Sequence, residues 1–189
     1  GKFQSAEYCR VAKGGNRVWI QATYNPIFDR LGRPYKVVKF ATNITEQKLR
    51  NADYEGQIAA ISKSQAVISF NLDGTIIDAN DNFLNASGYK LEDIQGEHHR
   101  MFMPPDDRDS QAYKEFWAAL RRGEFRAGEF RRLRRDGSEL WLQASYNPIF
   151  DMNGEPFKVV KYATDRTPEV LVRKQRAAAQ KSIDNDLAG

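Results

Sequence analysis

The feature that most constrains this chain is an internal repeat. The segment "WIQATYNPIFDRLGRPYKVVKFATNIT", which begins at Trp19, matches "WLQASYNPIFDMNGEPFKVVKYATDRT", which begins at Trp141. A shift along the sequence places residues 3–45 on residues 125–167, with about half of the positions identical. A repeat with so long a period is typical of tandem domains and not of a solenoid. Residues 61–124 have no counterpart before the first copy, so we expect one complete unit and the C-terminal strands of another.

The complete unit has the pattern of an α+β domain. Asp73-Gly74, Asp136-Gly137 and the 151–154 segment are tight-turn signals between short apolar runs, so the strands that they join are antiparallel. Apolar residues recur at helical spacing between Ser110 and Arg122, before Gly123. We therefore predict a five-stranded antiparallel sheet with helices on one face, with strands at 66–71, 75–80, 124–134, 138–150 and 156–164.

The repeat also predicts the domain boundaries. Residues 1–45 would be three strands of a first unit, 46–65 a connecting helix, 66–167 the complete unit and 168–189 an exit helix. The three strands of the first unit have an apolar face with no helices of their own to cover it. We expect these strands to be covered by another chain, to be swapped, or to be stabilised by the 46–65 helix.

The motifs of the complete unit resemble those of the PAS sensory domain. They are "ISFNLDGTIIDAN", "NFLNASGY", "GEHHRMF", "FWAALRRGEFRAGEF", "DGSELWLQASYNPIFD" and the closing "KVVKYATDRT". The sequences of these motifs are similar to those in the PAS domain pairs of bacterial methyl-accepting chemotaxis transducers of the aerotaxis and biofilm-dispersion type. The resemblance implies a PAS fold and a sensory role, and it leaves the ligand undetermined because similar PAS scaffolds hold different groups or none.

The sequence indicates neither an enzyme nor a metal site. It contains no glycine-rich phosphate loop, no Cys/His spacing typical of a metal site and no nucleophile motif, so catalytic and metal-binding residues are predicted to be absent. The net charge is +4, and arginines gather between residues 121 and 135. They alternate with apolar residues, which indicates the water-facing side of a strand and not a nucleic-acid surface.

The resemblance places a ligand pocket between the helices and the inner face of the sheet. Its predicted wall consists of His98, His99, Arg100, Trp117 and Leu142. A histidine there could bind haem iron, the His-Arg pair resembles flavin-binding aerotaxis domains, and an empty pocket is the third alternative. Phe125-Arg126 stands where those flavin domains have a tryptophan, and the unit has no cysteine for light-driven flavin chemistry. FAD, haem and no cofactor therefore stay open.

Two further sets of residues are predicted to carry the signal. Asp165 and Thr167 match the end of the PAS motif and would join the last strand to the exit helix, whereas Trp19 and Trp141 would form an interface on the outer sheet face. We predict a cytoplasmic sensory module of a chemotaxis-type transducer, which passes a ligand or redox change to a downstream signalling domain. It would be a homodimer through the PAS sheet or its flanking helices, without nucleic-acid partners or direct membrane contact. The alternative is a ligand-free PAS interaction or dimerisation module.

Overall fold

The structure is a computed structural model, which describes the backbone of residues 1–187 and the side chains of residues 1–181 and 183. The chain divides into two compact units, Gly1–Ala60 and Ile61–Gly189, which are described separately. Residues 188–189 of the predicted exit segment lie outside the described residues.

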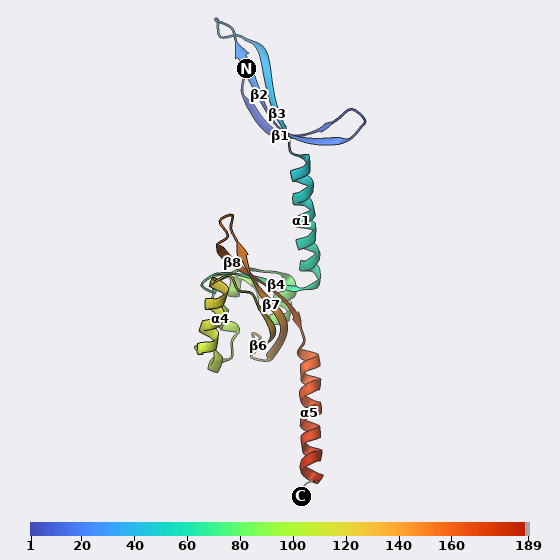
Figure 1. The fold of residues 1–189 in the computed structure, drawn as a ribbon, viewed down its shortest axis with the longest axis vertical. Coiled ribbons are helices and arrows are strands. Elements are labelled where there is room, and N and C mark those ends of the chain that lie inside the picture. The colour runs from blue at the N-terminus through green and yellow to red at the C-terminus, as the bar shows by residue number, and fades with distance from the viewer. Residues whose placement is uncertain (188–189) are drawn as a thin grey trace. The chain divides into compact units, whose positions relative to one another are not determined.

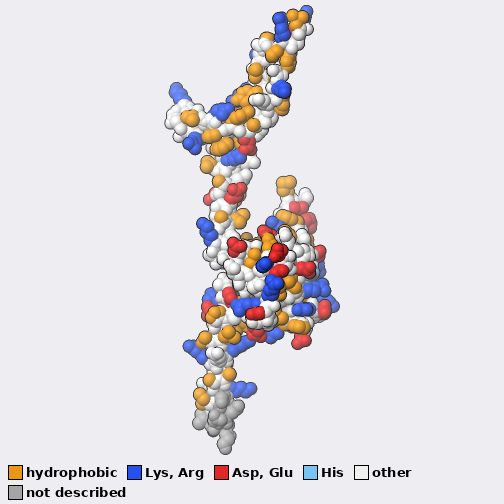
Figure 2. All heavy atoms as spheres, turned by 180° about the vertical axis from the view of Figure 1, so that it is seen from behind, with side chains coloured by type: hydrophobic (Ala, Val, Ile, Leu, Met, Phe, Trp, Pro, Cys, Tyr) orange, Lys and Arg blue, Asp and Glu red, His pale blue; other side chains and the backbone are white. Residues whose placement is uncertain are grey.

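The first unit is a three-stranded antiparallel sheet in the order β1-β2-β3 (Figure 1). Its strands are β1 (Gln4–Val11), β2 (Arg17–Phe28) and β3 (Pro34–Asn43), and helix α1 (Thr45–Ser64) follows. Helix α1 buries none of its residues, and Ala22 is the one described hydrophobic residue of this unit that is fully buried. Figure 2 shows hydrophobic side chains at the surface of these strands, Phe40 and Tyr35 among the exposed ones. The 46–65 helix does not cover the apolar face, although Lys48 of α1 pairs with Glu7 of β1, and cover by another chain or by a swapped element stays a prediction.

The second unit has the predicted five-stranded antiparallel sheet, in the order β5-β4-β8-β7-β6. The predicted α+β class is thus confirmed, with two strands before the helical segment and three after it. The strands are β4 (Ala66–Asn71), β5 (Ile76–Ala79), β6 (Arg126–Leu133), β7 (Glu139–Phe150) and β8 (Pro156–Asp165). Between them lie α2 (Asp81–Ser87), α3 (Leu91–Ile94), η1 (His99–Phe102), η2 (Pro105–Asp107) and α4 (Gln111–Arg121), and α5 (Thr167–Leu187) follows the sheet.

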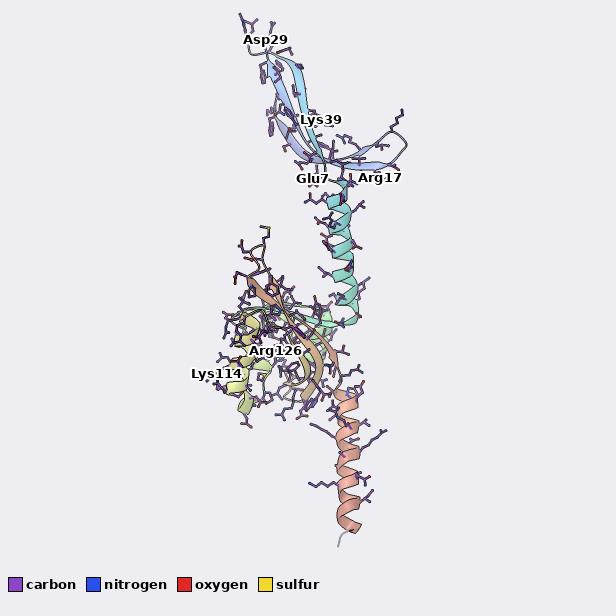
Figure 3. All side chains as sticks on the ribbon, in the orientation of Figure 1. Glu7, Arg17, Asp29, Lys39, Lys114 and Arg126 are labelled. Atoms are coloured by element: carbon purple, nitrogen blue, oxygen red, sulfur yellow. The ribbon has the colours of Figure 1, made fainter. Side chains whose placement is uncertain are left out.

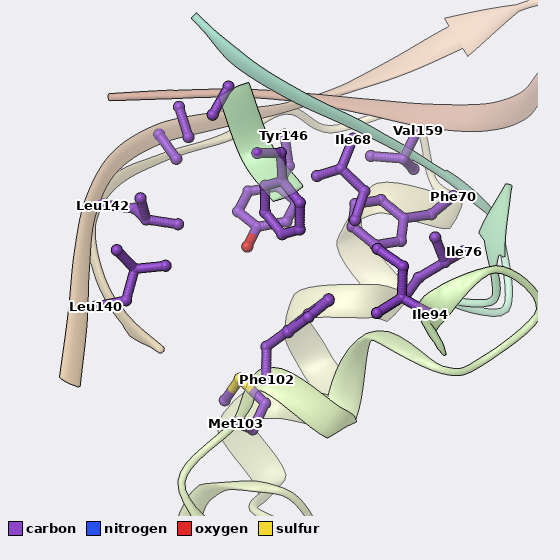
Figure 4. Packing of buried hydrophobic residues seen from close by; sticks show 14 of the residues in the cluster. Ile68, Phe70, Ile76, Ile94, Phe102, Met103, Leu140, Leu142, Tyr146 and Val159 are labelled. Carbon is purple, nitrogen blue, oxygen red and sulfur yellow. The ribbon is translucent and has the colours of Figure 1, made fainter. Parts of the chain in front are cut away.

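The core of the second unit lies between the concave face of the sheet and the helical segment. Period-two alternation on β7 turns Leu140, Leu142, Ala144 and Tyr146 inward, and all four are buried (Figure 4). Helix α4 packs Tyr113, Trp117 and Leu120 against them, and the Ser110 hydroxyl caps it by accepting from the Tyr113 N–H. The sheet and helices together form one hydrophobic cluster.

Two local details of the second unit depend on single residues. Helix η1 forms within the segment "EHHRMFMPP" because the His98 side chain accepts from the Arg100 N–H and starts a turn, and η2 begins at the last residue of this segment, Pro105. Pro148 pairs in register with Val159, and the bulge follows between Ile149 and Phe150. The proline is tolerated because β6 pairs with β7 only as far as Tyr146, so the missing N–H faces no neighbouring strand.

Candidate functional site

Three of the predicted pocket residues meet at a surface groove of about 230 Å³ beside α4. His98, Arg100 and Trp117 line it, together with Asp73, Arg108, Asp109, Tyr113, Lys114 and Arg121. Lys114 projects outward from α4 in Figure 3. Four lysine or arginine side chains and two carboxylates line the groove, so it attracts anions. Leu142 lies on the inner face of β7 and does not line this groove.

His99 points away from the groove and into the core, where its side chain is fully buried. Its Nδ1 lies 2.9 Å from the Tyr113 hydroxyl and its Nε2 lies 3.1 Å from the Tyr146 hydroxyl. Burial, and then the positive charges of Arg132 and Lys161, hold the pKa of His99 well below its ordinary value. The imidazole is therefore neutral at physiological pH and links the two tyrosines.

Two cations that the sequence reading did not select complete this buried site. Arg132 on β6 and Lys161 on β8 are 6% and 2% exposed. Arg132 Nη2 donates to the Tyr146 hydroxyl at 3.1 Å, and Lys161 Nζ lies 4.8 Å from the centroid of the Tyr146 ring. Tyr146 thus lies between two cations, with His99 at its hydroxyl.

Burial and charge act in opposite directions on these groups. Burial raises the pKa of Tyr146, but the charges and hydrogen bonds of Arg132 and Lys161 outweigh it and leave that pKa below the ordinary value. Burial lowers the pKa of Lys161, and Tyr146 offsets part of this change. Burial raises the pKa of Tyr113 to about 12, so its hydroxyl stays protonated. The interior therefore favours negative charge at the hydroxyl of Tyr146.

The prediction that the arginines of residues 121–135 lie on the water-facing side of a strand was wrong for Arg132. The register of β6 with β7 pairs Phe130 with Leu142 and Arg132 with Leu140, so both β6 residues share the inward face. Lys161 lies between the inward-facing Val159 and Ala163 in the same way. Every second residue of a strand faces the same side of the sheet. Counting in steps of two from these inward-facing apolar neighbours would therefore have placed both cations on the inner face.

The interior is filled by side chains where a planar cofactor would lie. Phe70 is 5.3 Å from His99, 5.7 Å from Trp117 and 6.3 Å from Tyr146, measured between ring centroids. Figure 4 shows the rings of Phe70 and Tyr146 projecting from the sheet into this interior. Both nitrogens of His99 are engaged, so it offers no free lone pair to haem iron. The residues as arranged do not fit a haem, and a flavin ring would have to displace this aromatic cluster.

Asp165 and Thr167 join the last strand to the exit helix. Thr167 N–H donates to Asp165 Oδ1 at 2.8 Å, and Arg134 Nη2 donates to Asp165 Oδ2 at 2.9 Å. The Trp141 N–H in turn donates to Thr167 Oγ1 at 2.9 Å, and the Trp141 carbonyl accepts from the Arg166 N–H at 2.8 Å. The start of α5 is therefore hydrogen-bonded to β7, the neighbour of the last strand in the sheet.

Trp19 and Trp141 occupy equivalent places on the outer faces of their sheets. The Trp141 ring lies 4.6 Å from Lys174 Nζ of α5, and the Trp19 ring lies 5.4 Å from Lys48 Nζ of α1. Each ring is therefore partly covered by the helix that follows its own sheet, and Trp19 remains 38% exposed.

The described residues contain no group of three or more His, Cys, Asp or Glu side chains placed to hold a metal ion. Among the same residues, no helix combines the length and the apolar composition needed to cross a membrane.

Comparison with known proteins agrees with this architecture. A family model described as "PAS fold" matches residues 76–163, and one described as "PAS domain" matches residues 1–46. Biofilm dispersion protein BdlA of Pseudomonas aeruginosa is 42% identical over 165 residues, which are 87% of this chain and 40% of that protein. The Aerotaxis receptor of Escherichia coli is 34% identical over 79 residues, which are 42% of this chain and 15% of that protein. The chain thus spans less than half the length of either relative.

Solved structures show the same fold. The PAS domain of a Colwellia psychrerythraea protein superposes with a TM-score of 0.54 at 26% identity, over 61% of this chain and 98% of that one. A light-oxygen-voltage domain, from a study of a flavin analogue, superposes with a TM-score of 0.53 at 22% identity, over 68% of this chain and 97% of that one. With its five-stranded sheet, its helical segment and both family matches, the chain belongs to the PAS domain family.

Proposed function

We propose that this chain is the sensory part of a cytoplasmic chemotaxis-type transducer. Its relatives include BdlA and the Aerotaxis receptor, which supports a role in sensory signal transduction. In this proposal, a change in the core of the second unit moves the sheet, and α5 carries the movement to a downstream signalling domain. A ligand can drive this only by binding two arrangements of the module unequally.

The hydrogen-bonded junction between β7 and α5 is the observation on which the proposal rests. Thr167 is 7% exposed and Val170 is 2% exposed, so the first turn of α5 packs against the sheet. Beyond that turn, Leu171 and Val172 are 46% and 45% exposed. Exposed apolar residues on an exit helix are suited to pairing with a second copy of this helix, which supports a homodimer through the flanking helices.

Substitution at the junction tests the relay. In the full-length protein, the double change Asp165→Ala and Thr167→Ala should uncouple the signalling output from the stimulus. The matched control is Asn43→Ala with Thr45→Ala, the equivalent pair of the first unit, where Thr45 Oγ1 accepts from the Trp19 N–H. Thr167→Ser keeps the hydroxyl and should keep the output. Normal output from a folded Asp165/Thr167 double variant would refute the relay.

The second candidate function is a ligand-free interaction module. The packed aromatic interior favours it, because a planar cofactor would have to displace those rings. The visible absorbance of the purified protein separates this candidate from a cofactor-loaded sensor. A Soret band or a flavin spectrum would rule out the ligand-free module, and a colourless protein would rule out a resident haem or flavin.

A further inference from the structure

The buried cluster of the second unit has two cations and no carboxylate. None of the ion pairs among the described residues includes Arg132 or Lys161, and no carboxylate contributes to the pKa change of Lys161. Taking a cation out of water without a counter-charge costs several kcal/mol. The inside of the sheet therefore holds two positive charges that no carboxylate of the described residues balances.

One hydrogen-bond donor of this cluster has no partner. Arg132 Nη1 donates to the Arg131 carbonyl at 2.7 Å and Nη2 donates to Tyr146, whereas Nε is buried with no hydrogen-bond partner. Buried donors without a partner are rare, and each calls for an acceptor. A guanidinium edge with a free Nε matches the planar edge of a carboxylate.

The first unit builds the same cluster a second time. Arg10, Tyr24 and Lys39 are identical to Arg132, Tyr146 and Lys161 of the second unit, although about half of the aligned positions differ. Arg10 Nη1 donates to the preceding carbonyl at 3.0 Å, and Lys39 Nζ lies 5.3 Å from the centroid of the Tyr24 ring. Figure 3 labels Lys39 on this sheet.

Surrounding contacts repeat as well. The guanidinium of Arg10 lies 4.6 Å from the Tyr8 ring, as that of Arg132 lies 5.1 Å from the Phe130 ring. Tyr8 also meets Tyr24 edge-to-face at 5.6 Å, as Phe130 meets Tyr146 at 5.3 Å. The three strands alone therefore build the cluster, without the helical segment.

Small residues lie beside the cluster on the same inner face. In the second unit the strand registers align a row across four strands: Gly128, Ala144, Ala163 and Ala66. In the first unit the same row is Ala6, Ala22 and Ala41. The sheet itself therefore places no bulky side chain in this row beside the cluster.

We propose that the Arg132–Tyr146–Lys161 cluster is a binding site for a small organic carboxylate. The carboxylate accepts from Arg132 Nε and the Tyr146 hydroxyl, and Lys161 supplies the second positive charge. His99 holds the Tyr146 hydroxyl from the other side, and Tyr113 joins His99 to the basic groove at the surface. Carboxylate binding at this site does not depend on the proposed sensory function. Only the role of the site rests on that function, because the bound carboxylate would be the signal.

Calorimetry and thermal melting of the whole chain in chloride-free buffer test the binding, with acetate, succinate, inorganic phosphate and chloride as probes at equal ionic strength. Arg132→Met and Lys161→Met should each weaken carboxylate binding by about tenfold or more, since each removes a charged partner. Both apo variants should melt no lower than the wild type, because methionine removes an uncompensated buried charge. Arg131→Met, an exposed neighbour, is the matched control and should bind normally.

Three results would overturn the proposal: no anion binds, the methionine variants bind as well as the wild type, or phosphate or chloride binds as tightly as the carboxylates. A tyrosinate absorption at neutral pH that disappears in Tyr146→Phe would also overturn it, because the chain would then supply its own anion. Binding that survives Asp165→Ala with Thr167→Ala, together with normal signalling output from this variant in the intact protein, would leave the site standing and refute the relay alone.

Discussion

His99 makes the stability of the second unit depend on pH in a defined direction. The neutral ring is surrounded by groups from four elements, none of which is a carboxylate: Tyr113, Arg132, Tyr146 and Lys161. Protonation would place a third positive charge in a dry interior. Replacement by glutamine keeps a donor and an acceptor but removes the titration, so we choose His99→Gln as the perturbation.

The sign and the magnitude follow from linkage. Because the folded-state pKa lies well below the ordinary 6.5, the unfolded chain binds a proton first as the pH falls. The His99 contribution is thus fully present above 6.5 and is lost below it. Each further pH unit costs about 1.4 kcal/mol until the folded-state pKa is reached. Between pH 7.5 and pH 5 the wild type should lose at most about 2 kcal/mol that His99→Gln does not lose.

Urea unfolding at these two pH values measures the difference, followed by tryptophan fluorescence and near-ultraviolet circular dichroism. Trp117 is buried beside His99, with ring centroids 5.5 Å apart, and reports on this core. His98→Gln is the matched control, because His98 lies at the groove. The stability of this variant should keep most of the wild-type pH dependence. Equal losses in the wild type and in His99→Gln would show that His99 is not held neutral in the core.

Two further predictions concern packing. Leu142→Ala should lower the free energy of unfolding of the second unit by about 2–5 kcal/mol, because Leu142 is fully enclosed. Ile20→Ala, the equivalent change in the uncovered first unit, should lower it much less. Equal losses of free energy would mean that the first sheet is covered in solution. Gly74→Ala should lower the melting temperature, because Gly74 has a φ of +92° and a Cβ there would come within 2.7 Å of His98 Nε2; an unchanged melting temperature would contradict this packing.

Much of the fold could be predicted from the sequence because strand alternation and turn residues are local signals. The inward face of β7 and the helix before β6 were found in this way, and the tight turns fixed the antiparallel order. The site was harder to predict. His98 and His99 are neighbours in sequence, and only the 3-10 turn at His99 sends one ring to the groove and the other to the core.

The sequence by itself determined the repeat, because its two copies are similar along their whole length, and the antiparallel order, because short turns join the strands. The resemblance of the closing motif selected Asp165 and Thr167. Only the tertiary structure decided that Arg132 and Lys161 meet at Tyr146. These residues lie on three different strands, and charged residues on a strand are read as exposed until the register of the neighbouring strands places them on the inner face. Burial makes the two charges costly unless a negative charge balances them, whereas the same side chains in water would need no partner.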